Sequence, residues 1–162
     1  MSSFLDSYNL SILALPAYYL LSIVPHAYAI TLGSGGDVSK FDNANPRSLS
    51  QKDRFKQSLS PELYARYERA EAAHHNSFES MPLFVAATLA GNMAGLKREG
   101  WDGMDGFAGA FLAVRALYAA LYVNHTTQGA SYVRSSLWAA GMALCVRVLV
   151  KSAKAMSGKV LL

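Results

Sequence analysis

The segment Arg69-Ala-Glu-Ala-Ala-His-His-Asn-Ser-Phe-Glu79 is rich in ionisable and amide side chains. It leads directly into the apolar run Ser80-Met-Pro-Leu-Phe-Val-Ala-Ala-Thr-Leu-Ala90. No glycine or proline stands before Pro82, so we expect one helix to carry both parts. Ionisable groups at the edge of a membrane span are costly and often mark a functional site. On this stretch alone, the polar start of an ordinary span is an equally good interpretation.

The apolar residues of this 162-residue chain are clustered, which is why a modest mean hydropathy of +0.15 conceals several blocks that could cross a membrane. A helix needs about 20 apolar residues to cross a bilayer. We therefore predict an all-α membrane protein in one domain of residues 1–162, with spans at about 10–32, 70–96, 106–123 and 130–150. The polar residues 33–61, rich in turn-forming and charged side chains, are predicted to form an extramembrane loop with one short helix near 49–59.

The first apolar block has a second interpretation, because Ala27-Tyr28-Ala29 resembles the cleavage site of a signal peptide. Against it, the residues before the block contain no lysine or arginine and include Asp6. Basic residues are more frequent in the long loop and at the start of the second long helix than on the other side, which favours a cytoplasmic loop. Basic groups at the edges of apolar blocks favour membrane lipids as partners, and no pattern indicates nucleic acid. The single Cys145 excludes an intrachain disulfide.

Polar side chains share one face of the second long helix, at about 62–96. Arg69, Asn76 and Glu79 fall on one stripe, because seven residues return nearly to the same angle. His75 lies one turn before Glu79. His74, His75 and Glu79 offer too few ligands at a recognised spacing, so we predict no metal site.

The third predicted span carries a similar stripe, formed by Arg115, Tyr118 and Tyr122. Neither stripe can face lipid, so the two should turn toward each other. Arg134 and Ser135, at the start of the fourth span, would lie at the same end. The sequence therefore predicts a positively charged, hydroxyl-bearing pocket at the cytoplasmic end of a four-helix bundle.

Several arginines with one carboxylate suit a ligand that bears carboxylates and one ammonium group. A ligand thiol beside arginine and a hydroxyl donor would ionise more readily and become a nucleophile. The alternative is a structural ion-pair network in which Glu79 neutralises Arg115 across the bundle. A transporter that uses Glu79 as a proton site is a further class, which the lack of internal repeats argues against.

Three segments resemble the MAPEG family, the membrane-associated proteins of eicosanoid and glutathione metabolism. Glu68-Arg-Ala-Glu-Ala-Ala-His-His-Asn-Ser-Phe-Glu79, followed by Pro82, resembles the signature of the family's second helix. Val114-Arg-Ala-Leu-Tyr-Ala-Ala-Leu-Tyr122 resembles its third-helix pattern, and Tyr132-Val-Arg-Ser135 resembles the start of its fourth helix. The resemblance implies a left-handed four-helix bundle that forms a homotrimer in the endoplasmic reticulum, with glutathione as co-substrate between neighbouring subunits.

The resemblance also implies which residues bind or orient glutathione: Arg69, Asn76, Glu79, Arg115, Tyr122, Arg134 and Ser135. His75 and Tyr118, which neighbour them on the two helices, complete the expected binding set. Glu79 would meet the ligand's ammonium and the arginines its carboxylates, while Arg134 with Ser135 would carry the catalysis by stabilising the thiolate. The chain departs from the pattern at Ala72, where a basic residue is usual, and at Tyr118, where one branch has histidine.

From these observations we expect a glutathione-dependent membrane enzyme that acts on a lipophilic electrophile or a lipid peroxide, resembling glutathione transferases and peroxidases. The hydrophobic second substrate would enter from the bilayer. The missing basic positions motivate an alternative, a non-catalytic lipid-binding or scaffold protein of the same fold.

Overall fold

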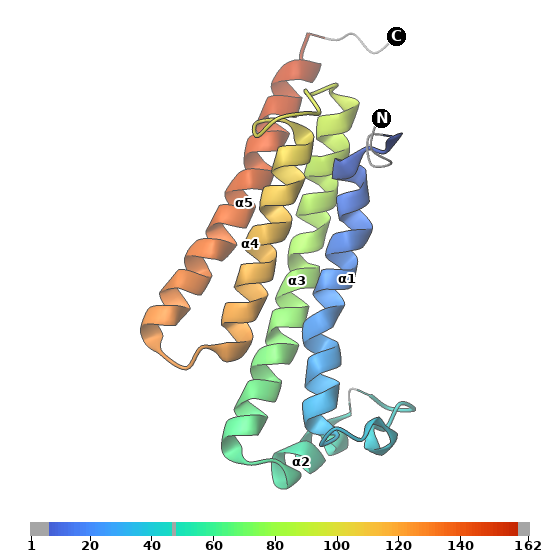
Figure 1. Ribbon diagram of the computed structural model, residues 1–162, viewed down its shortest axis with the longest axis vertical. Helices are drawn as coiled ribbons and strands as arrows, with labels where there is room; N and C mark the ends of the chain where they lie inside the picture. Colours follow the sequence, from blue (N-terminus) through green and yellow to red (C-terminus); the bar gives the residue numbers. More distant parts are fainter. Residues whose placement is uncertain (1–6, 47, 159–162) are drawn as a thin grey trace.

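The computed structural model describes residues 7–46 and 48–158, and its regular elements are all helices, with no strand among these residues (Figure 1). The elements are α1 (Leu10–Gly33), the 3₁₀ turn η2 (Val38–Lys40), α2 (Leu49–Ser58), α3 (Pro61–Met93), α4 (Met104–Asn124) and α5 (Gln128–Met156). The all-α prediction is therefore confirmed. The predicted short helix in the loop is α2.

The four long helices α1, α3, α4 and α5 run side by side, and α2 lies at the end where α1 stops and α3 begins (Figure 1). Helix α3 contacts each of the other four α-helices. Each face of α3 therefore meets a different neighbour, and this decides where its polar side chains point.

The ends of α3 are set by local capping. At its start, the Ser60 hydroxyl accepts a hydrogen bond from the backbone of Leu63, and Pro61 occupies the first turn. At its end, the Leu96 amide donates to the Gly91 carbonyl at 3.0 Å, and Gly95 takes a φ of 70°. This left-handed cap closes the helix at Met93, three residues before the predicted end.

An aromatic cluster holds α1, α3 and α4 together at mid-height. The rings of Phe84 and Phe111 stack with their centroids 4.0 Å apart, and Tyr18 meets both edge-on. All three side chains are almost fully buried. The cluster fixes the register of α4 against α3 one turn away from Arg115.

Among the described residues, three helices are long and apolar enough to cross a membrane, namely α1, α4 and α5. They coincide with three of the four predicted spans. Helix α3 does not meet the same criterion, because its first half carries the polar segment from Arg69 to Glu79. That α3 also crosses the membrane remains a prediction.

Gly106 and Gly109 lie one turn apart on α4 and provide a matched pair for testing the packing of the α3–α4 turn. A Cβ on Gly106 would lie 2.5 Å from the Gly100 carbonyl oxygen, whereas a Cβ on Gly109 would meet nothing within 4 Å. We predict that Gly106→Ala lowers the free energy of unfolding by about 1–3 kcal/mol, because backbone must move. Gly109→Ala should instead raise it by about 0.5–1 kcal/mol through helix propensity. Thermal unfolding in detergent, followed by circular dichroism, measures both; equal effects would contradict the packing described.

Candidate functional site: an arginine–tyrosine stack

Arg115 is a buried cation in the middle of α4, with 2% of its surface exposed. Its Nη2 donates to Asn76 Oδ1 at 3.1 Å and to Ser77 Oγ at 3.3 Å, both on α3. Its Nε has no hydrogen-bond partner. Of the predicted stripe on α3, Asn76 therefore does turn toward Arg115.

No carboxylate neutralises this guanidinium among the described residues, whose ion pairs all lie elsewhere: His26–Glu71, Lys40–Asp37 and Arg98–Asp105. The predicted alternative of an Arg115–Glu79 ion pair is therefore wrong. A buried charge without an opposite charge is costly, and its neutral partners here offset only part of that cost.

Aromatic rings supply the remaining contacts of Arg115. The guanidinium carbon lies 4.4 Å from the centroid of the Tyr118 ring and 5.9 Å from that of Tyr18. The Tyr118 ring meets Tyr122 edge-on at 5.5 Å, and the guanidinium of Arg134 lies 4.2 Å from the Tyr122 centroid. We call Arg115, Tyr118, Tyr122 and Arg134 the arginine–tyrosine stack. Two adjacent rings are thus flanked by one cation from α4 and one from α5, and the two cations suit an anionic ligand.

Other predicted residues lie at the same end of the molecule as Arg134. Arg134 also donates to Ser131 Oγ at 3.2 Å. The exposed Ser135 hydroxyl donates to the Ser131 carbonyl at 3.1 Å. From α3, Arg69 Nε donates to the Val123 carbonyl at 3.0 Å, so its charge lies at the C-terminal end of α4, where the helix dipole favours a cation.

His75 and Glu79 lie on a different face. Both are exposed and line an open groove of about 690 Å³ between α1 and α3, together with Tyr19, Ile23, His26, His74 and Phe78. None of these groove residues lines the narrow space beside Arg115, which is bounded by side chains such as Ser80 and Trp138. The groove and the narrow space beside Arg115 are therefore two separate cavities, and a shared binding site for the predicted residues stays a prediction.

Four contacting residues were not among the predicted binding residues: Ser77, Tyr18, His26 and Glu71. Ser77 is the second acceptor for Arg115, and the Tyr18 hydroxyl donates to the Ser77 carbonyl at 2.8 Å. His26 Nδ1 lies 2.7 Å from Glu71 Oε1, and its ring stacks on His74 at 4.7 Å. Ser77 and Glu71 are in the quoted segment, but no spacing rule distinguishes them. Tyr18 and His26 lie on α1, where only the tertiary arrangement reveals their role.

The described residues gather no group of three or more His, Cys, Asp or Glu side chains that could hold a metal ion. The cationic side chains and rings of the stack suit an organic anion instead.

The sequence model of the MAPEG family matches residues 10–154, which include the stack, the groove and all four long helices apart from the last two residues of α5. The chain therefore belongs to the MAPEG family. Family membership and the three apolar helices identify it as a membrane protein of the group associated with glutathione and eicosanoid metabolism. No curated protein and no solved structure matches the chain.

Asn76→Asp tests whether the charge of Arg115 is uncompensated. The substitution keeps the shape of the side chain and places a carboxylate where Asn76 Oδ1 now accepts from Arg115. Because hydrogen bonds between charged groups are stronger, we predict that the free energy of unfolding rises by about 1 kcal/mol. The exposed Asn43→Asp in the loop, with the same change in net charge, should leave it unchanged. Thermal unfolding measures both, and a clear loss of stability in Asn76→Asp would show that the guanidinium already has its charge balanced.

Proposed function

We propose that this protein is a glutathione-dependent membrane enzyme that acts on a lipophilic electrophile or a lipid peroxide. The observation that carries the proposal is the arginine–tyrosine stack. Its buried Arg115 forms no ion pair with a carboxylate among the described residues. Glutathione carries two carboxylates, one ammonium group and one thiol. A carboxylate of this ligand would supply the negative charge that Arg115 lacks within the chain.

The chemistry follows from the position of Arg134. A thiol beside a guanidinium loses its proton more readily, because the positive charge stabilises the thiolate. Arg134 is held by Tyr122 and Ser131, and Ser135 follows it on the more exposed side of α5. The thiolate sulfur would form a bond to an electrophilic carbon. In a substitution the bond to the leaving group breaks and its electron pair departs with that group; in an addition the π-electron pair moves to the neighbouring atom, which then takes a proton. With a hydroperoxide, the same sulfur would attack the terminal oxygen, the O–O bond would break and the alcohol would leave. A second glutathione would then reduce the resulting sulfenic acid, giving glutathione disulfide and water.

A neighbouring subunit would complete the site. Glu79, the expected partner of the ammonium group, and His75 line the groove between α1 and α3 and not the narrow space beside Arg115. In the homotrimer that we propose, the groove of one chain would lie against the stack of the next. Helix α5 is compatible with such a contact, because it exposes large apolar side chains: Tyr132, Val133, Trp138, Val146 and Val150.

The proposal includes α3 as the fourth span of a left-handed four-helix bundle in the endoplasmic reticulum membrane. The end with α2 and the α4–α5 turn would face the cytoplasm. Glutathione, which is polar, would reach the stack from that side, and the lipophilic substrate would arrive through the bilayer.

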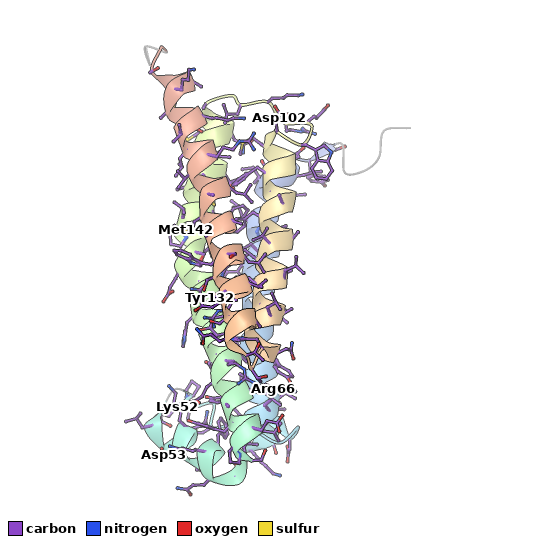
Figure 2. The ribbon with its side chains drawn as sticks, turned by 90° about the vertical axis from the view of Figure 1, so that its left-hand side faces the viewer. Lys52, Asp53, Arg66, Asp102, Tyr132 and Met142 are labelled. Carbon is purple, nitrogen blue, oxygen red and sulfur yellow. The ribbon has the colours of Figure 1, made fainter. Side chains whose placement is uncertain are left out.

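Arg134→Ala tests the proposal most simply. We predict that the variant loses thiolate formation and conjugation of a lipophilic electrophile, and that it binds glutathione about 10- to 100-fold more weakly, because a charge-assisted contact is lost. Arg66→Ala is the control: Arg66 lies on α3 three residues before Arg69 (Figure 2) and belongs to none of the ion pairs of the described residues. The thiolate is measured by ultraviolet absorbance, and glutathione binding by titration calorimetry in detergent.

Full activity in Arg134→Ala would contradict the catalytic role, and no binding at millimolar glutathione would favour the non-catalytic lipid-binding or scaffold alternative. The shared site is tested by mixing subunits. If Arg134→Ala and Glu79→Gln each abolish activity, mixed trimers should regain part of it, because some sites would then combine an intact stack with an intact groove. No recovery in verified mixed trimers would contradict a site between subunits.

A further inference from the structure

A second cationic site lies at the opposite end of the molecule from the arginine–tyrosine stack. It is a pocket of about 110 Å³ between the α3–α4 turn and the last turns of α5. Lys97, Arg147 and Lys151 contribute its charge, and Phe107, Leu144 and Val148 contribute apolar surface. In Figure 2, Asp102 marks this end and Lys52 and Asp53 mark the other. We propose that this pocket binds the phosphate-bearing headgroup of an anionic membrane phospholipid.

The pocket is rich in uncompensated positive charge. Lys97, Arg147 and Lys151 take part in none of the ion pairs found among the described residues. Asp105, the carboxylate at the start of α4, is already paired with Arg98 at 3.4 Å. Asp102 is the one acidic residue that lines the pocket. The lining therefore has an excess of two positive charges, which a phosphodiester with one negative charge would reduce.

The α5 side of the pocket places two cations next to each other. Arg147 and Lys151 are four residues apart, so they lie one turn apart on the same face, with Leu144 and Val148. Like charges at this spacing repel each other. An anion bound between these two side chains and Lys97 would attract all three cations and so offset their mutual repulsion. Proteins recognise phosphate groups through such charge-assisted hydrogen bonds.

The position of the pocket favours a lipid over a free phosphate. Trp101 lines the pocket and is 93% exposed, and tryptophan is enriched where membrane spans meet the aqueous interface. Beside the lining residues Arg147 and Lys151, α5 exposes Val146 and Val150, which offer a path for an acyl chain along the helix. Long basic side chains at such a depth can place their charge among headgroups while their stems contact apolar surface.

The turn that forms one wall is held rigidly. The amides of Met104 and Asp105 donate to the carbonyls of Lys97 and Arg98, both at 2.9 Å. A Cβ on Gly103 or Gly106 would collide with backbone carbonyl oxygens of this turn. The wall therefore exists before any ligand binds, which reduces the ordering cost of binding. This inference does not rest on the proposed enzyme function, because it uses none of the residues of the stack or the groove.

The test is native mass spectrometry of the full chain with added phosphatidylglycerol or phosphatidylcholine. We predict that phosphatidylglycerol binds preferentially, and that the double variant Arg147→Gln/Lys151→Gln weakens it by roughly fivefold for each charge removed. The control Lys52→Gln/Lys154→Gln changes the net charge equally at exposed lysines that do not line the pocket. The control should keep the wild-type preference, and so should the charge-preserving variant Arg147→Lys/Lys151→Arg.

Several results would overturn the proposal. If the control variant loses as much phosphatidylglycerol binding as the double variant, the effect is one of general charge. If the wild-type protein binds phosphatidylcholine as well as phosphatidylglycerol, the headgroup charge is not recognised. Displacement of phosphatidylglycerol by inorganic phosphate at equal concentration would assign the pocket to a free anion. If the double variant unfolds, the single variants Lys97→Gln and Lys151→Gln provide the same comparison, and no loss in either would also contradict the site.

Discussion

The charge of Arg115 is the constraint on which the polar half of this structure depends. The guanidinium is 2% exposed and is held by an amide oxygen, a hydroxyl and two tyrosine rings rather than by a carboxylate. Neutral partners compensate a buried cation only in part. The fold therefore holds an uncompensated positive charge at Arg115. The binding of an anion would stabilise the folded protein by offsetting part of the desolvation cost of that charge.

Helix α3 makes this arrangement possible because it contacts all the other α-helices. One face presents Asn76 and Ser77 to Arg115, and another presents His75 and Glu79 to the groove beside α1. The aromatic cluster of Tyr18, Phe84 and Phe111 fixes the register between α1, α3 and α4. The acceptors on α3 are therefore held in position for the hydrogen bonds with Arg115. Stability and the candidate site thus depend on the same packing.

Much of this arrangement could be predicted from the sequence, for identifiable reasons. The apolar blocks and the Ser60–Pro61 cap gave the helices nearly as they are found, and helical spacing placed Arg115, Tyr118 and Tyr122 on one face. Spacing gives an angle around a helix but does not say which neighbour lies at that angle. This is why the predicted Arg115–Glu79 contact was wrong, and why the pairing of His26 with Glu71 was missed. The glycine at position 95 indicates the end of α3, and the left-handed cap that it forms closes the helix three residues before the predicted bound.

We propose that the arginine–tyrosine stack recognises a carboxylate-bearing thiol. The most direct measurement compares the binding of glutathione and of its diethyl ester to the wild-type protein by titration calorimetry in lipid nanodiscs. The ester keeps the thiol and the ammonium group but lacks both negative charges. We predict that the ester binds at least about tenfold more weakly than glutathione, because the charge-assisted contacts with the arginines are lost. Equal affinity for the two compounds would contradict it.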